Sequence, residues 1–154
     1  MDMHPQEALV ELLHSGSQLP PSELNATLRT IWPQLRAPQR SHDGAALVAL
    51  FRRAGYVSDG IPQPNTELTV YRGELVNSHE SGISWTTDAQ VATQYARGYS
   101  TVGNTQVVQA VAPPVAVLAR FSQEAEAVVD PSLLKEHKKL GYIPHCVLPN
   151  FMNG

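Results

Sequence analysis

The chain has 154 residues, and its 42% hydrophobic and 16% charged residues are typical of one folded domain rather than a disordered segment. A formal net charge of −3 excludes a broad basic face, so non-specific attraction to phosphate is not expected to drive binding. The single cysteine excludes an internal disulfide, and we recognise neither a signal peptide nor a run of membrane-spanning length. We therefore expect residues 1–154 to form one cytoplasmic domain that does not enter a membrane.

The N-terminal 55 residues are predicted to be helical. Apolar residues recur there at helical spacing in three stretches, each closed by a glycine or a proline. The first stretch ends at Gly16, the second lies between Pro20 and Pro33, and the third lies between Asp43 and Gly55. This segment contains no evident chemistry, although it could form a surface for a partner.

Beyond residue 56 the apolar residues recur with a period near two, which is typical of strands. One helix interrupts the strands, because Thr87-Asp88-Ala89-Gln90 matches a capping box and apolar residues follow at helical spacing. Helices gathered at the front of the chain, followed by neighbouring strands, predict an α+β fold rather than a parallel array. The predicted strands are Glu67–Arg72, Ile83–Thr86, Thr105–Val111, Val115–Phe121 and Ala125–Asp130.

The first motif that can carry chemistry is Tyr71-Arg72-Gly73, at the end of an apolar strand. A guanidinium group is a planar fork that binds phosphate through two hydrogen bonds, and a following glycine lets the backbone approach a ligand closely. The ordinary alternative is a strand-end arginine that lies in solvent or pairs with a carboxylate.

The second motif is Gly82-Ile83-Ser84-Trp85-Thr86, where alternation places the Ser84 and Thr86 hydroxyls on one face of a strand. Buried hydroxyls must find partners, which are backbone groups, a carboxylate or a ligand. Alternation points Trp85 to the opposite face, so we expect it to pack in the core. The alternative for the hydroxyl pair is a half-exposed strand that leads into a capped helix.

The third motif is Glu124-Ala125-Glu126, at the start of an apolar strand. Alternation predicts that both carboxylates lie on one face, about 6–7 Å apart along the strand. One carboxylate can bind a ribose hydroxyl and stabilise a developing positive charge, while the second can orient or deprotonate a nucleophile. Charges that guard an exposed strand edge are the alternative.

In this order, the three motifs resemble the Arg-Ser-Glu class of mono-ADP-ribosyltransferases, the clade of the C2- and cholera-type toxins and the arginine-specific ectoenzymes. The resemblance covers about residues 56–132 and is greatest to small bacterial and phage-borne members. It implies an α+β fold in which residues 56–150 form a split β-sandwich core, preceded by a helical segment of residues 1–55. It also implies transfer of ADP-ribose from NAD to an acceptor, with NAD hydrolysis as a side activity.

The resemblance assigns roles in NAD binding and catalysis. Arg72 is expected to bind the NAD phosphates, and the backbone of Gly73 is expected to meet the nicotinamide amide. Ser84 is expected to hold the catalytic glutamate and the nicotinamide ribose, with Thr86 supporting the pocket wall. Glu126 matches the catalytic glutamate, which binds the ribose 2′-hydroxyl and favours the oxocarbenium-like state as nicotinamide leaves.

Two residues are expected on the acceptor side. Glu124 matches the residue that faces the acceptor in arginine-modifying members of the class. Phe121 resembles the aromatic residue of the acceptor-recognition loop, and a core aromatic that ends a strand is the equal alternative. Trp85 departs from the class, because a threonine is common at its position.

The expected chemistry uses NAD as a co-substrate and no metal. Nicotinamide leaves as a neutral molecule, so the enzyme must stabilise positive charge on the ribose rather than supply a strong acid. The histidines are scattered without the pattern of a metal site, and no glycine-rich loop of the dinucleotide-fold type is present.

The sequence leaves the acceptor open. Paired glutamates favour a protein arginine, because a carboxylate can pair with and orient a guanidinium group. The alternatives are a nucleobase of RNA or DNA, as in toxin–antitoxin or anti-phage enzymes, and a catalytically silent NAD-binding module. The resemblance further implies a bacterial or phage toxin or effector, cytoplasmic or delivered to a target-cell cytoplasm, with an inhibitory partner or antitoxin.

Overall fold

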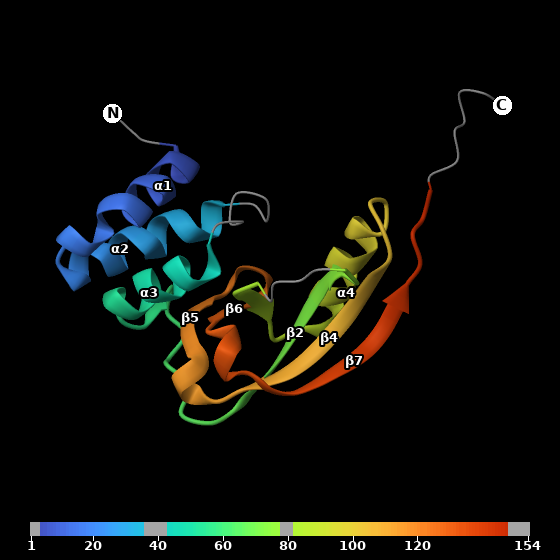
Figure 1. Cartoon of the computed structure of the whole chain (residues 1–154). Helices are drawn as coiled ribbons and strands as arrows, with labels where there is room; N and C mark the ends of the chain where they lie inside the picture. The colour runs from blue at the N-terminus through green and yellow to red at the C-terminus, as the bar shows by residue number, and fades with distance from the viewer. Residues whose placement is uncertain (1–3, 36–42, 78–81, 148–154) are drawn as a thin grey trace.

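The computed structural model describes residues 4–35, 43–77 and 82–147 (Figure 1). Its helices are α1 (Pro5–Ser15), α2 (Pro21–Ile31), α3 (Gly44–Ala54) and α4 (Ala89–Tyr99). Its strands are β1 (Val57–Ser58), β2 (Leu68–Leu75), β3 (Ser84–Thr86), β4 (Thr105–Ala112), β5 (Val117–Phe121), β6 (Glu126–Val129) and β7 (Lys135–Ile143). Short 3₁₀ turns include η2 (Trp32–Gln34), η4 (Pro114–Ala116), η5 (Gln123–Ala125) and η6 (Pro131–Leu133).

The three N-terminal helices begin and end for local reasons that the sequence already contained. Prolines occupy the first turn of α1 and of α2, where the missing N–H has no partner in the helix anyway. The Asp43 carboxylate caps α3 by accepting hydrogen bonds from the backbone N–H groups of Ala45 and Ala46. Gly55 ends α3 at a φ of 78°, which side chains rarely adopt. The prediction of these helices is confirmed.

The fourth helix is also confirmed, but its predicted capping box is wrong. Asp88 is the N-cap residue, and its carboxylate accepts a hydrogen bond from the backbone N–H of Gln90. Thr87 instead donates its backbone N–H to the carbonyl oxygen of Ala125 at 3.0 Å. Thr87 therefore ties the start of α4 to the turn before β6 rather than capping the helix.

The strands form one seven-stranded mixed sheet in the order β1-β5-β6-β3-β2-β4-β7. β1 pairs in parallel with β5, and the remaining neighbours are antiparallel. β2 pairs with β4 along its whole length, whereas β2 and β3 share a single residue pair, Tyr71 with Thr86. Helices and sheet together confirm the α+β class. The strands that carry the three motifs, β2, β3 and β6, are neighbours in the centre of the sheet.

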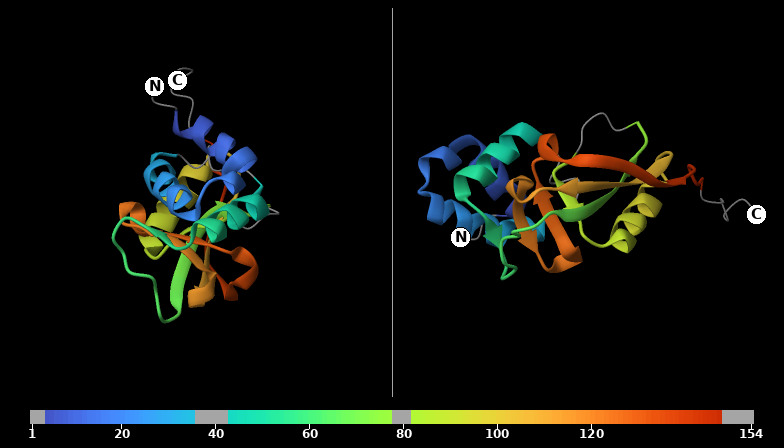
Figure 2. Two further views of the ribbon diagram at one scale, coloured as in Figure 1. Left: turned by 90° about the vertical axis from the view of Figure 1, so that its left-hand side faces the viewer. Right: turned by 90° about the horizontal axis from the view of Figure 1, so that it is seen from below.

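The N-terminal helices pack against one end of this sheet (Figures 1 and 2). One cluster of buried side chains joins Trp32 and Phe51 of the helical segment to Ile83, Phe121 and Val128 of the sheet. Burial of such apolar surface is the main force that holds the two parts together. A second cluster, which includes Trp85, Ala127 and Val129, lies on the opposite face, as strand alternation requires.

Two strands escaped the sequence prediction. β1 has two residues, and every residue of β7 except Ile143 is exposed, so neither strand shows the alternation that marks a half-buried strand. The strand predicted from Val115 begins at Val117, because Pro114–Ala116 forms a 3₁₀ turn. Across residues 4–35, 43–77 and 82–147, no helix has the length and apolar character to cross a membrane.

Candidate active site

The fold brings the three sequence motifs together. Arg72 lies on β2, Ser84 on β3 and Glu126 on β6, and β3 pairs with both of the other strands. In the β3–β6 register Thr86 lies opposite Glu126 and Ser84 lies opposite Val128. Directly opposed residues on antiparallel strands point to the same face, so Ser84 and Glu126 are diagonal neighbours within reach of one another.

Glu126 is a buried carboxylate, and among the described residues it accepts hydrogen bonds from different parts of the chain. Oε2 of Glu126 accepts a hydrogen bond from the Ser84 hydroxyl at 2.5 Å and another from the Trp32 indole N–H at 3.0 Å. Glu126 is only 6% exposed. A carboxylate removed from water in this way requires such hydrogen bonds, because an uncompensated buried charge is costly. The prediction that Ser84 holds the carboxylate of Glu126 is confirmed as a contact.

Trp32 is a contact that sequence analysis missed, and it joins residues 1–55, for which no chemistry was expected, to the Glu126 carboxylate. Trp32 follows α2 in η2 and is fully buried. From the sequence it is one more apolar residue of a helical segment. The available signal was its indole N–H, which needs an acceptor whenever tryptophan is buried.

Arg72 is fixed beside the Ser84–Glu126 pair. Its Nη1 donates to the backbone carbonyl of Ser84 at 2.8 Å, and its Nε lies 3.3 Å from Oε2 of Glu74. The Arg72 side chain is 26% exposed, so it is not fully enclosed by the protein. A β-carbon on Gly82 would lie 2.4 Å from the guanidinium carbon, so any other residue there would displace the Arg72 guanidinium group from its present position. Arg72 therefore pairs with a carboxylate, which was the ordinary alternative for a strand-end arginine, and it also contacts Ser84 of the second motif.

Gly73 has a packing role that the sequence did not reveal. A β-carbon at this position would lie 2.1 Å from the backbone oxygen of Ala92 and 2.6 Å from the backbone nitrogen of Ala96. These atoms belong to α4 and cannot move aside as a flexible side chain would. The bare α-carbon of Gly73 thus lets α4 lie directly on β2, and a backbone contact of Gly73 with a ligand stays a prediction.

The predicted shared strand face of Glu124 and Glu126 is wrong. β6 begins at Glu126, whereas Glu124 lies in the preceding turn η5 with a φ of 57°, followed by Ala125 at 49°. Two successive residues in the left-handed region redirect the chain, so strand alternation does not relate the two side chains. Glu124 is exposed, and its Oε2 accepts a hydrogen bond from the Tyr95 hydroxyl of α4 at 2.5 Å.

The turn that carries Glu124 is held in place by groups outside it. The Thr86 hydroxyl donates to the carbonyl oxygen of Glu124 at 2.8 Å, so the second hydroxyl of the Ser84/Thr86 pair supports this turn. Asp59 accepts hydrogen bonds from the backbone N–H and the hydroxyl of Ser122. The hydrogen bond from the Ser122 hydroxyl holds the pKa of the Asp59 carboxyl below its ordinary value. These contacts keep the strained turn in one conformation.

Trp85 and Phe121 are core residues. Trp85 is 4% exposed on the face opposite Ser84, as predicted, and its indole N–H donates to the carbonyl oxygen of Gly82 at 2.8 Å. Phe121 is fully buried in the cluster beneath the N-terminal helices. Phe121 is therefore the core aromatic residue that ends a strand. The predicted role in acceptor recognition is wrong, because a side chain with no exposed surface cannot contact an acceptor.

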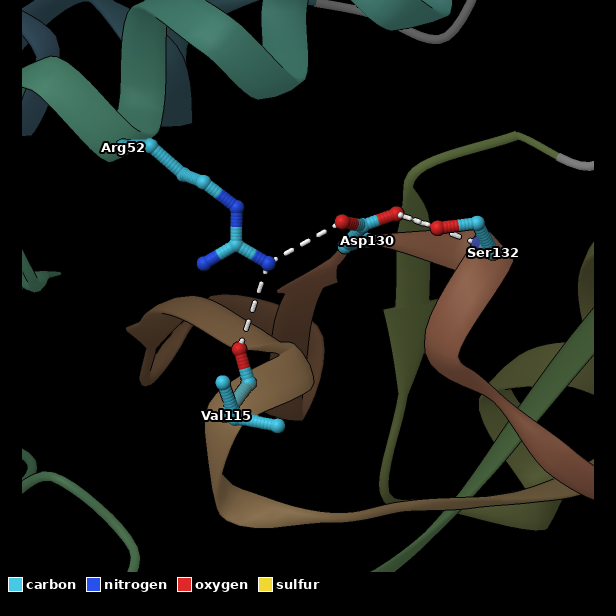
Figure 3. A network of polar contacts seen from close by, with 4 residues as sticks. All are labelled: Arg52, Val115, Asp130 and Ser132. Atoms are coloured by element: carbon cyan, nitrogen blue, oxygen red, sulfur yellow. Dashed lines mark hydrogen bonds and ion pairs between the residues drawn. The ribbon is translucent and has the colours of Figure 1, made fainter.

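A polar network joins α3 to the far end of β6 (Figure 3). Nη2 of Arg52 donates to the Asp130 carboxylate at 3.0 Å and to the carbonyl oxygen of Val115 at 3.3 Å. Ser132 donates to the same carboxylate through its backbone N–H and its hydroxyl. Partial burial alone would raise the pKa of Asp130, but the hydrogen bonds from Ser132 and Arg52 together hold it below its ordinary value. The helical segment is thus attached to β6 near both of its ends.

Comparison of the chain with protein-family models, curated proteins and solved structures found no match. The described part of the chain also contains no group of three or more histidine, cysteine, aspartate or glutamate residues arranged to hold a metal ion.

Proposed function

We propose that this protein is a mono-ADP-ribosyltransferase, which cleaves NAD at the bond between nicotinamide and ribose and transfers ADP-ribose to an acceptor. The observation that carries the proposal is the connected set Arg72–Ser84–Glu126, in which one serine donates its hydroxyl to the glutamate and its carbonyl accepts from the arginine. These residues come from three separate strands. Their association supports the resemblance of the three motifs to the Arg-Ser-Glu class.

The chemistry fits a fixed, buried carboxylate. As the glycosidic bond breaks, its electron pair passes to the pyridinium nitrogen, nicotinamide leaves as a neutral molecule, and positive charge develops on the ribose. Glu126, which is only 6% exposed, would stabilise that charge more strongly than a solvated carboxylate could. A nucleophile then forms the new bond to the ribose carbon and releases a proton. With water as the nucleophile, the products are ADP-ribose, nicotinamide and a proton.

Arg72 is suited to anchor the NAD diphosphate. Its side chain is 26% exposed, and the orientation of its guanidinium group is fixed by Ser84 and Glu74 before any ligand arrives. Glu74 is itself held by Gln106, whose amide donates to Glu74 Oε1 at 3.2 Å. A preorganised fork loses little conformational freedom on binding phosphate, so its binding energy can serve to orient the reacting ribose.

The acceptor we favour is a protein arginine. Glu124 is exposed at the turn next to Glu126, and its carboxylate is oriented by Tyr95. An exposed, oriented carboxylate beside the reacting carbon can pair with a guanidinium group and hold it for attack. The different surroundings of the two glutamates support a division of labour, with the buried Glu126 acting on ribose and the exposed Glu124 on the acceptor.

The proposal includes a split β-sandwich as the core of residues 56–150. The single residue pair between β2 and β3, next to fully paired strands on either side, supports a division of the sheet at that junction. Figure 1 supports the same division, because β2, β4 and β7 run together away from the N-terminal helices while β5 and β6 lie beside them. Arg72 and Ser84 lie on the two strands at this junction.

The direct test is incubation of the purified chain with NAD labelled in its adenylate phosphates, together with a cell lysate. We expect release of nicotinamide and a labelled macromolecule from which protease, but not nuclease, removes the label. Glu126→Gln should abolish both signals, whereas Glu11→Gln, the same chemical change at an exposed position of α1, should leave both intact. Removal of the label by nuclease alone would replace the arginine acceptor with a nucleobase, and absence of nicotinamide release would refute the proposed function.

A further inference from the structure

Within the described residues, Trp32 links the N-terminal helical segment to the candidate catalytic carboxylate. The Trp32 indole N–H donates to Oε2 of Glu126 at 3.0 Å, across 94 positions of sequence. The Ser84 hydroxyl donates to the same oxygen from the neighbouring strand. The donors approach from different elements, so together they restrict both the position and the rotation of the carboxylate group more than either could alone.

The Trp32 ring is held rigidly enough to fix the direction of its N–H. Trp32 has no exposed surface, and its ring meets that of Phe51 edge to face, with centroids 5.0 Å apart and an angle of 87° between the planes. Phe51 belongs to α3 and is itself 1% exposed. Close packing of this kind leaves a large ring few alternative rotamers, so the indole N–H is directed by the helical segment as a whole.

The helical segment is in turn fixed to the sheet at other points. The Asn25 side-chain amide of α2 donates to the carbonyl oxygens of Ala54 and Tyr56, which flank the junction between α3 and β1. Arg52 of α3 binds Asp130 at the end of β6 (Figure 3). The helices therefore hold β6 near both of its ends, through Trp32 at Glu126, the first residue of the strand, and through Arg52 at Asp130, just beyond the last.

We propose that Trp32 is a positioning residue for Glu126, so that the N-terminal helical segment forms part of the active site and is more than a cover for the sheet. The catalytic half of this inference rests on the proposed function. Trp32 does not touch the substrate; it keeps the carboxylate in the orientation that the developing ribose cation requires. Loss of one donor to a buried charged group is expected to lower turnover about 10- to 100-fold.

The test uses Trp32→Phe in the full chain, because phenylalanine retains a ring against Phe51 and removes only the N–H donor and part of the ring. Trp85→Phe is the matched control, since it also deletes a buried indole N–H, but on the opposite face of the sheet. We expect Trp32→Phe to lower kcat for NAD hydrolysis about 10- to 100-fold with little change in the affinity for NAD, and Trp85→Phe to retain most of the turnover. A purely structural role of Trp32 would instead lower the folded fraction of Trp32→Phe and leave its kcat per folded molecule unchanged, which would overturn the inference.

A second measurement does not depend on activity. In the protein labelled with ¹⁵N at the indole nitrogens, the Trp32 signal is assigned by its absence in Trp32→Phe. Glu126→Gln should move this signal and leave that of Trp85 in place, whereas Glu124→Gln should move neither. An unchanged Trp32 signal in Glu126→Gln would overturn the positioning role even if the parent cleaves NAD. If Glu126→Gln shifts the Trp32 signal but the parent protein does not cleave NAD, the Trp32–Glu126 contact is supported and the proposed function is rejected.

Discussion

Removal of the Ser84 hydroxyl should reduce catalysis without removing the catalytic group. In Ser84→Ala the Glu126 carboxylate loses the donor at 2.5 Å but keeps the Trp32 indole at 3.0 Å on the same oxygen. Hydrogen bonds to charged groups contribute about 1.5–3 kcal/mol, and we take the middle of this range because the Trp32 indole still donates to the same oxygen. A loss of about 2 kcal/mol corresponds to about a 30-fold lower kcat for NAD hydrolysis. The assay is nicotinamide release at saturating NAD, with affinity measured separately by calorimetry.

The matched control is Ser132→Ala, which also removes a hydroxyl that donates to a carboxylate, here Asp130 at 2.7 Å. Asp130 lies beyond β6 and has no part in the proposed chemistry, so this variant should keep parental turnover. The reasoning would be refuted if Ser84→Ala, folded to the same extent as the parent, released nicotinamide within about twofold of the parental rate.

Four further predictions test the other parts of the site. Arg72→Lys should weaken NAD binding measured by calorimetry, because an ammonium group cannot form the bidentate contact with phosphate; unchanged affinity would make Arg72 a structural residue only. Glu124→Gln should lose transfer to protein while retaining slow NAD hydrolysis, and equal loss of both activities would contradict the division of labour between the glutamates. Gly73→Ala should lower the free energy of unfolding by about 1–3 kcal/mol in urea, because its β-carbon would overlap backbone atoms of α4, and parental stability would contradict that packing. The Asp130 carboxyl has a lowered pKa in the folded state, so its contribution to stability is present above its ordinary pKa of about 3.9 and is lost as the pH falls through the folded value. The free energy of unfolding in urea should therefore fall less between pH 7 and pH 3 in Asp130→Asn than in the parent. An equal fall in the two proteins would show that Asp130 does not contribute to the acid-induced loss of stability.

Features that depend on local sequence could be predicted. The helices are set by apolar spacing, by prolines in their first turns, and by residues such as Asp43 and Gly55 at their ends. All of these act within a few positions of one another, so the sequence contains the whole cause. The alternation that placed Ser84 and Trp85 on opposite faces is equally local, and both placements agree with the structure.

Features that depend on distant contacts could not be predicted from the sequence. Trp32 reaches Glu126 across the interface between helices and sheet, and no local pattern encodes that meeting. The left-handed turn at Glu124 and Ala125 contains no glycine and is maintained by Thr86 and Tyr95 from other elements. Because the sequence does not reveal these partners, it favoured regular strand alternation, which is wrong for the two glutamates.

β7 shows a different limit of sequence reasoning. Its residues are exposed on both faces apart from the half-buried Ile143, so burial imposes no alternation of apolar and polar residues. The strand is specified instead by backbone pairing with β4, which runs from Lys135 opposite Val111 to Ile143 opposite Thr105 with two register shifts. Backbone hydrogen bonds of this kind are available to almost any sequence and leave little trace in it.

The central claim is that Glu126 stabilises the ribose cation formed as nicotinamide leaves NAD. The most direct measurement is nicotinamide release from NAD by the purified chain, compared with that by Glu126→Gln under conditions where both variants bind NAD. The glutamine preserves the size of the side chain and an oxygen that can accept from Ser84 and Trp32, but it removes the charge. We predict steady release by the parent and loss of turnover with retained NAD binding in the variant. Equal turnover in the two proteins would contradict the claim.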